Sequence, residues 1–161
     1  MATPFKIRRA ELRDVESLVN MRFELLHVAA ALGVPTNLSD EEWEAVREAT
    51  RDYFKKALTS GEHCGVVAEA EGIVVGCGGI VFMERPPYQG NLRGREAYLM
   101  NMYTVPAWRK KGVGGAIVAE LLQCARDAGA KRVSLDAEQN ARKLYGKAGF
   151  HGNVEAMEIL L

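Results

Sequence analysis

The sequence predicts a single α/β domain over residues 1–161, built on a mixed, mostly antiparallel sheet flanked by helices. A length of 161 residues with 48% hydrophobic content suits one core. Segments of alternating apolar residues are interspersed with segments of helical periodicity, and no internal repeat or long linker divides them. One helical segment joins two expected strands, which makes that strand pair parallel and places ligand chemistry at its carboxyl ends.

The charge balance excludes several partner classes. Lysine and arginine together number 21, as do aspartate and glutamate, so no overall field attracts nucleic acid or an anionic membrane. The first residues lack the apolar stretch of a secretory signal, and no run of about eighteen apolar residues occurs. We therefore expect a soluble, cytoplasmic protein that binds neither nucleic acid nor membrane.

The chain has three widely spaced cysteines, Cys64, Cys77 and Cys124. An odd number without clustered histidines argues against both a disulfide framework and a zinc site, and no metal is expected. Each cysteine lies in an apolar stretch without a nearby basic partner in the sequence. Buried packing is therefore favoured over the alternative that one of them is a covalent nucleophile.

A strand and two helices are expected first. Phe5 and Ile7 alternate with basic residues, a pattern typical of a short half-buried strand. A helix follows, with Asp14 in its first turn, where negative charge is favourable, and Gly33 with Pro35 ends it. The second helix begins with a capping box, in which the side chains of Ser39 and Glu42 satisfy two backbone donors, and it stops at Ser60-Gly61.

A hairpin and a parallel pair are expected next. Residues 64–70 and 73–83 are rich in valine and small residues and flank Glu71-Gly72, which predicts a two-residue turn. Residues 85–90 contain two prolines and a glycine and are expected to form a loop. The remaining expected elements are a strand at 96–105, a helix at 113–126, a strand at 133–137, a short helix at 141–147 ended by Gly149, and a strand at 154–160.

The segment from Arg109 to Gly115 has the composition of an anion site. It leads from a strand straight into a helix, whose first backbone amides have no partner. Its glycines permit close approach of a ligand, and three consecutive cations, Arg109, Lys110 and Lys111, suit a pyrophosphate. Lys111 precedes the glycines and no later glycine follows Gly114 at the right spacing, which excludes a P-loop and a dinucleotide fingerprint. The alternative is a basic turn that merely starts a helix.

A second segment, Asn140 to Phe150, favours the anion site. Together the two segments resemble the GCN5-related N-acetyltransferase (GNAT) superfamily, with its patterns Arg/Gln-x-x-Gly-x-Gly/Ala and Ala-x-x-Leu-Tyr-x-Lys-x-Gly-Phe. The order, the spacing, the intervening helix and strand, and the opening strand and helices are also similar. The matching residues are Arg109, Gly112 and Gly114 in the first pattern and Ala141, Leu144, Tyr145, Lys147, Gly149 and Phe150 in the second.

The resemblance implies a GNAT fold in which acetyl-CoA, the cosubstrate, inserts its pantetheine arm where two central parallel strands splay apart. It implies that the arm pairs with the backbone of the first strand, that the pyrophosphate meets amides of the turn, that Asn140 contacts the arm, and that Tyr145 lies near the thioester sulfur. The cofactor-binding residues implied in this way are Met102, Tyr103, Val105, Arg109, Lys110, Lys111, Gly112, Val113, Gly114, Gly115 and Asn140.

Tyr145 is the expected catalytic residue. Aminolysis of a thioester needs a proton for the departing thiolate, and a phenol with a pKa of about 10 stays protonated at neutral pH. The alternative is a core aromatic residue. The sequence does not identify the general base that takes the proton of the amine, since residues 99–102 contain no carboxylate. The candidates are Glu96, Asp136, or water held by Asn101.

The acceptor is expected to be the amine of a small molecule. The alternatives are a protein acetyltransferase and a CoA-binding sensor without catalysis, and dimers are common among similar proteins, so a homodimer is compatible. Arg85, Arg93 and Arg95 either attract an acidic acceptor or are solvated. Six residues of the first two helices are candidates for an acceptor pocket, although most are expected to be core: Met21, Phe23, Leu26, Trp43, Tyr53 and Phe54.

Overall fold

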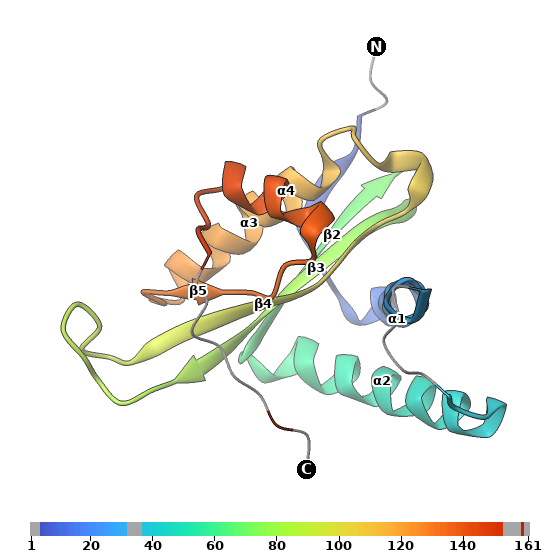
Figure 1. The fold of residues 1–161 in the computed structure, drawn as a ribbon, viewed down its shortest axis with the longest axis horizontal. Helices are drawn as coiled ribbons and strands as arrows, with labels where there is room; N and C mark the ends of the chain where they lie inside the picture. The colour runs from blue at the N-terminus through green and yellow to red at the C-terminus, as the bar shows by residue number, and fades with distance from the viewer. Residues whose placement is uncertain (1–3, 32–36, 153–158, 160–161) are drawn as a thin grey trace.

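The computed structural model describes residues 4–31, 37–152 and 159 (Figure 1). Strands and helices follow one another in the expected order, with short 3-10 turns at three connections. The elements are β1 Lys6–Arg9, η1 Leu12–Asp14, α1 Val15–Ala31, α2 Asp40–Ser60, β2 His63–Ala70, β3 Ile73–Glu84, β4 Arg95–Thr104, η2 Pro106–Trp108, α3 Val113–Asp127, β5 Val133–Ser134, η3 Gln139–Ala141 and α4 Arg142–Lys147.

The five strands form one mixed sheet in the order β1-β2-β3-β4-β5. The first three pairings are antiparallel, and β4 pairs with β5 in parallel, which confirms the predicted mixed sheet. The parallel pairing comprises Ala97 with Val133 and Tyr98 with Ser134; β5 ends there, whereas β4 continues to Thr104. Pairing with β5 thus stops halfway along β4, and within the described residues no other strand pairs with the second half of β4 on this side.

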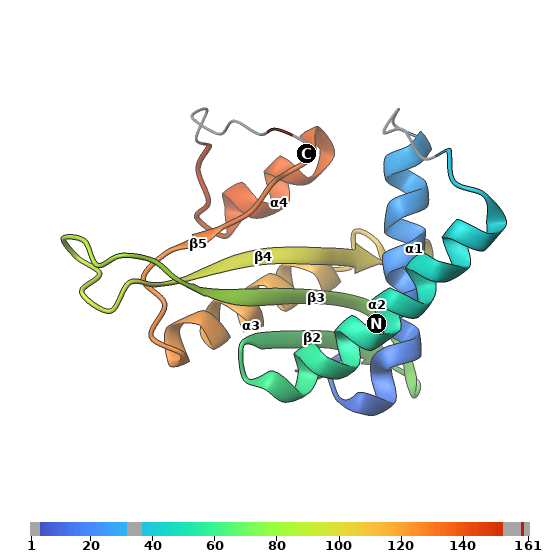
Figure 2. The same cartoon turned by 90° about the horizontal axis from the view of Figure 1, so that it is seen from below.

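Helices cover both faces of the sheet. Figures 1 and 2 show α3 on one face and α1 with α2 on the other. The face under α3 and α4 holds one core cluster, which includes Val66, Ile80, Leu99 and Ile117. The opposite face holds a second cluster, in which Phe54 of α2 and residues of α1 pack on the sheet. Within the described ranges, no helix is both long enough and apolar enough to cross a bilayer.

Local sequence signals set the boundaries of α2 and of the β2–β3 hairpin. The backbone amide of Glu42 donates to Ser39 Oγ at 3.2 Å, and that of Ser39 donates to Glu42 Oε2 at 2.7 Å, so the predicted capping box is confirmed. Glu71 and Gly72 both have positive φ, 52° and 78°, as a two-residue hairpin turn matched to the twist of its strands requires.

A bulge interrupts the pairing of β3 with β4. Cys77 is opposite Tyr103 and Gly79 is opposite Met100, so two residues of β4 face the single residue between Cys77 and Gly79. One of these two, Asn101, has a φ of 56°. Such a bulge changes the direction of side chains and backbone at one point of a strand. This bulge lies in the half of β4 that does not pair with β5.

Some predicted boundaries differ from the structure. The strand expected at 133–137 is β5, Val133–Ser134, because the following residues turn away from β4 toward η3 instead of extending the pairing. The strand expected at 154–160 and the helix end expected at Gly33 and Pro35 lie outside the described residues, apart from Ile159.

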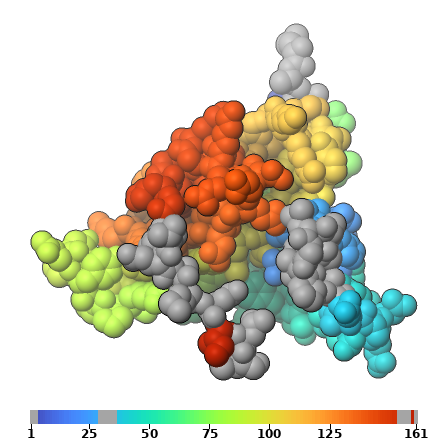
Figure 3. All heavy atoms as spheres, in the orientation of Figure 1, coloured from blue at the N-terminus to red at the C-terminus, as the bar shows by residue number. Residues whose placement is uncertain are grey.

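The connection between β3 and β4 projects from the end of the sheet (Figure 3). Its base is closed by polar contacts: Glu96 is 5% exposed, and its carboxylate accepts a hydrogen bond from the Tyr88 hydroxyl at 2.9 Å and pairs with Arg85 at 3.5 Å. Arg95 pairs with Glu84 at 2.6 Å. Glu96, a candidate base in the sequence, therefore serves to hold this connection together.

The three cysteines are buried and free, as the sequence predicts, but the expectation that none has a basic partner is wrong. The Arg9 guanidinium contacts the Sγ atoms of both Cys64 and Cys124. Arg9 also pairs with Glu120 of α3 at 3.3 Å. β1 brings this arginine beside β2 and α3, a proximity between distant residues that local sequence context does not reveal.

Candidate functional site

The turn before α3 presents backbone amides at its surface. Gly112, with a φ of 85°, is the N-cap of α3, and Lys110 has a φ of 60°. These left-handed conformations fold the chain sharply between η2 and the helix. The first backbone bond of the helix runs from the Ala116 amide to the Gly112 carbonyl at 3.0 Å.

No acceptor among the described residues takes the amides of residues 110–115. They cluster at the N-terminus of α3, where the helix dipole adds partial positive charge. Amides arranged in this way bind anions, phosphate groups among them. The turn thus has the unpaired amides that the sequence predicts, and anion binding by them stays a prediction.

The cations of this turn do not act alike. Arg109 turns back to β4, where its Nε donates to the Thr104 carbonyl at 3.0 Å and its guanidinium lies 5.7 Å from the centre of the Tyr103 ring. Lys111 lies over the Trp108 ring at 5.0 Å, and Lys110 is exposed. Arg109 thus anchors the turn to the strand end, while both lysines stay at the surface and add positive charge.

Gly114 allows α4 to approach this turn. A Cβ at Gly114 would lie 3.3 Å from Cδ2 of Leu144 in α4, closer than most carbon contacts. The absence of a side chain therefore brings the helix that carries Tyr145 against the first turn of α3. Asn140, in η3, is exposed at the start of the same segment.

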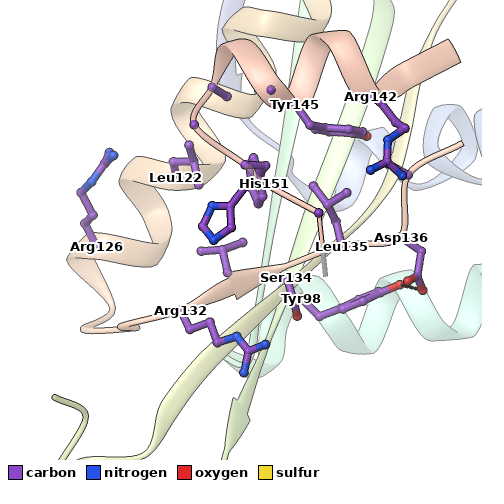
Figure 4. A pocket seen from close by; sticks show the side chains of 17 residues that line it. Tyr98, Leu122, Arg126, Arg132, Ser134, Leu135, Asp136, Arg142, Tyr145 and His151 are labelled. Carbon is purple, nitrogen blue, oxygen red and sulfur yellow. Dashed lines mark hydrogen bonds between the residues drawn. The ribbon is translucent and has the colours of Figure 1, made fainter. Parts of the chain in front are cut away.

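Tyr145 lines a cavity of about 900 Å³ between β5 and α4 (Figure 4). It is 7% exposed, and its ring packs edge-on against Phe150 at 5.9 Å. Burial, followed by the charge of Glu138, raises the pKa of its phenol. From the opposite side of the cavity, Tyr98 donates its hydroxyl to Asp136 Oδ2 at 2.6 Å.

The site thus combines the amide turn, a parallel strand pair that separates after Tyr98 and Ser134, and the buried Tyr145. We compared the sequence with models of known protein families. The model described as the acetyltransferase (GNAT) family matches residues 33–150. The chain belongs to the acetyltransferase (GNAT) family. The resemblance carried by the two sequence segments is therefore confirmed.

Known proteins agree with the GNAT assignment. Human N-acetyltransferase 8 is 33% identical over 102 residues, which cover 62% of this chain and 43% of that protein, so the chain spans less than half of this relative. A crystal structure of a predicted acetyltransferase with acetyl-CoA from Clostridium acetobutylicum is 25% identical, with a TM-score of 0.83 and coverage of 98% and 96%. A GCN5-related N-acetyltransferase from Ralstonia eutropha JMP134 shares the fold, at 21% identity, a TM-score of 0.80 and coverage of 98% and 99%.

In this GNAT chain, the second half of β4 leads along the chain to the amide turn, and β4 also contacts α1. Met102 and Tyr103 belong to the strand, and Val105 follows it, donating its amide to the Val75 carbonyl at 3.0 Å. At the bulge, Arg22 of α1 donates to Asn101 Oδ1 at 2.9 Å. Sequence reasoning missed this pairing, because the two residues are distant in the chain.

The expected acceptor pocket divides into core and surface. Met21, Phe23 and Phe54 are 3–6% exposed and belong to the core of the GNAT fold, as was expected of most of the six candidates. Trp43 packs against Phe23 at 5.6 Å, and Leu26 is half-buried. Tyr53 is 43% exposed, and its hydroxyl lies 3.9 Å from Met100 Sδ on β4. Tyr53 thus stands beside the open half of β4 and is exposed there.

The arginines of the β3–β4 connection are mostly occupied by acids. Arg85 and Arg95 pair with Glu96 and Glu84 respectively, and Arg95 also lies 4.5 Å over the Phe82 ring. Arg93 is exposed. This part of the GNAT chain therefore offers little free positive charge to an acidic acceptor.

Proposed function

We propose that this GNAT chain is a single-domain N-acetyltransferase that transfers the acetyl group of acetyl-CoA to a primary amine of a small molecule by direct attack. The observation that carries the proposal is the cluster of free amides at residues 110–115, placed beside the half of β4 that β5 leaves unpaired. A diphosphate at these amides directs the rest of the cosubstrate along β4 toward Tyr145.

The cosubstrate contacts follow from this geometry. The amides of residues 110–115 hold the diphosphate, and Lys110 and Lys111 add charge at the surface. The pantetheine arm runs along β4 and Val105, at Met102, Tyr103 and Val105, and pairs with the backbone groups of β4 that β5 leaves unpaired, as an added strand pairs with a sheet edge. Val105 adds a contact and no backbone hydrogen bond, because Val75 and Trp108 take its amide and its carbonyl. Asn140 contacts the arm from η3, and Arg109 holds the turn in place.

In the proposed reaction, the neutral amine nitrogen attacks the carbonyl carbon of the thioester. The oxyanion that forms accepts a hydrogen bond from a backbone amide of β4 near Met102. As the carbon–sulfur bond breaks, Tyr145 donates its phenolic proton to the thiolate, and the nitrogen, cationic after its attack, loses a proton to water. A proton from water then restores the Tyr145 phenol. The raised pKa of Tyr145 suits this role, because the phenol stays protonated through neutral and mildly alkaline pH.

The two acidic candidates for a general base are engaged elsewhere. Glu96 is bound by Tyr88 and Arg85 at the base of the β3–β4 connection. Asp136 accepts the Tyr98 hydroxyl, and burial, followed by this hydrogen bond, raises the pKa of Tyr98 to about 12. We therefore propose that the acceptor loses its proton to water before it attacks.

This proposal predicts how the rate depends on pH. An alkyl amine with a pKa of about 10.4 is neutral in about one molecule per thousand at pH 7.4, so kcat/KM should rise about tenfold per pH unit between pH 7 and 9. Loss of the Tyr145 proton does not oppose the rise, because burial lifts its pKa above the ordinary tyrosine value. An amine-panel assay that follows free thiol release over this range measures both turnover and slope.

The same assay separates the competing functions. Turnover of small amines with the predicted slope supports the proposal, and a flat profile with chemistry limiting would show that a protein base exists. Turnover of peptides alone would indicate a protein acetyltransferase. Binding of acetyl-CoA without turnover of any amine or peptide would indicate a sensor.

A further inference from the structure

Arg22 stands at the bulge of β4 with most of its hydrogen-bonding capacity unused. It is half-buried on α1, and Nη1 donates to Asn101 Oδ1 at 2.9 Å. A guanidinium has five N–H donors in a planar fork that matches a carboxylate or phosphate. Among the described residues, the side chain of Arg22 forms a hydrogen bond with Asn101 alone.

The charge of Arg22 is also uncompensated. Three other half-buried arginines have acidic partners: Arg8 pairs with Asp14, Arg51 with Glu16, and Arg95 with Glu84. A fourth, Arg47, donates to Asn20 and lies over the Phe23 ring. Among the described residues, no carboxylate forms an ion pair with Arg22. A partly desolvated cation without an anion costs free energy, which a negatively charged ligand recovers on binding.

A tyrosine and a methionine, Tyr53 and Met100, lie near Arg22. Tyr53 of α2 places its hydroxyl 3.9 Å from Met100 Sδ, one residue before Asn101 on β4. Burial raises the pKa of Tyr53, and the positive charge of Arg22 opposes that rise, so the guanidinium lies within electrostatic reach of this phenol. Three elements, α1, α2 and β4, thus converge on one point.

We propose that Arg22, with Tyr53 beside it, binds an anionic group of the acceptor and so selects amines that carry a carboxylate or phosphate close to the nitrogen. The inference rests on the proposed function, since it places the acceptor at this end of the site. Asn101, the partner of Arg22, is one residue from Met102, and consecutive Cα atoms are about 3.8 Å apart. An anion on Arg22 therefore holds the attached amine beside the thioester carbonyl.

The test compares matched acceptors on matched variants. Phenylalanine is paired with phenylalanine amide, and glucosamine 6-phosphate with glucosamine. Arg22→Gln keeps a donor for Asn101 but removes the charge, and Arg22→Lys keeps the charge but loses the fork. Arg13→Gln, at an arginine whose side chain is 65% exposed on η1, is the control.

We expect the wild type to prefer the anionic member of at least one pair by tenfold or more in kcat/KM, with each value calculated on the concentration of neutral amine. Arg22→Gln should lower kcat/KM tenfold or more for that member and less than twofold for the neutral one, with Arg22→Lys in between and Arg13→Gln unchanged. The pair that responds identifies the anion as carboxylate or phosphate. A wild type without this preference, or an equal loss on both members in Arg22→Gln, overturns the inference.

Calorimetry separates this outcome from failure of the proposed function. N-acetylphenylalanine, N-acetylphenylalanine amide and N-acetylglucosamine 6-phosphate are titrated into the protein with CoA present, which needs no turnover. If no amine is acetylated, the proposed activity fails, yet tighter binding of an anionic product that disappears in Arg22→Gln still upholds the anion site. Equal binding by wild type and Arg22→Gln overturns it.

Discussion

Replacement of Tyr145 by phenylalanine is expected to lower kcat by about 10²- to 10⁴-fold, the usual contribution of a general acid. The change keeps the aromatic ring and removes only the phenolic hydroxyl. Without it, the thiolate departs unprotonated, so the barrier to breaking the carbon–sulfur bond rises. Steady-state release of free thiol from acetyl-CoA at saturating amine measures the loss.

Packing provides the control for Tyr145→Phe. The ring contacts Phe150 edge-on and belongs to the cluster under α3 and α4, and a phenylalanine ring keeps these contacts. The urea midpoint and the Kd for acetyl-CoA should therefore stay close to the wild-type values. A variant with nearly full kcat would show that Tyr145 is a core residue without a chemical role.

Replacement of Asp14 by asparagine is expected to destabilise the fold by about 3 kcal/mol at pH 7, because it leaves a half-buried guanidinium without its main counter-charge. The Asp14 side chain is 4% exposed, and both its oxygens accept from Arg8, at 2.7 and 2.8 Å. The amide of Glu11 donates to it as well, at 2.8 Å. Glu69 remains as a second partner of Arg8, which keeps the loss at the lower end of the usual range.

The stability lost in Asp14→Asn should be largest at neutral pH and should decrease as the pH falls. Burial alone would raise the pKa of Asp14, but hydrogen bonds from Arg8 and from the Glu11 amide outweigh it and hold the pKa below the ordinary value. Since the folded pKa is depressed, the stabilisation is complete above the unfolded pKa of about 3.9 and disappears as pH falls through the folded value. Urea unfolding of wild type and Asp14→Asn should therefore differ most at neutral pH and converge in strong acid.

A surface pair is the matched control for Asp14→Asn. Asp52 and Lys55 lie one helical turn apart on α2, 3.9 Å apart and largely exposed. Asp52→Asn should leave the urea midpoint unchanged, because exposed pairs contribute little. Equal midpoints for wild type and Asp14→Asn at pH 7 would contradict the importance assigned to the buried pair.

Local signals were sufficient to predict most elements and the amide turn. The Ser39–Glu42 box, the Glu71–Gly72 turn and the glycines before α3 act through neighbours in the chain, so the sequence displays them directly. The helix that carries Tyr145 was also predicted from the local pattern, whereas the place of Tyr145 near the thioester sulfur was inferred from the resemblance to the GNAT superfamily.

Features that depend on long-range register were not predicted. The bulge at Asn101 arises from how β3 and β4 pair, and its contact with Arg22 spans α1 and β4. Likewise, Arg9 meets Cys64 and Cys124 because β1 lies beside β2 and α3. The short β5 reflects where the chain turns away from β4, which alternation of apolar residues at 133–137 does not indicate.

The central claim is that free amides of the turn before α3 bind the diphosphate of acetyl-CoA, and calorimetry on Gly115 tests it most directly. Gly115 is exposed in the first turn of α3, where proline is tolerated, so Gly115→Pro removes one amide donor and Gly115→Ala keeps it. We predict equal Kd values for wild type and Gly115→Ala, and at least tenfold weaker binding for Gly115→Pro, since hydrogen bonds to charged groups are worth about 1.5–3 kcal/mol. No heat of binding to the wild type, or wild-type affinity in Gly115→Pro, would contradict the claim.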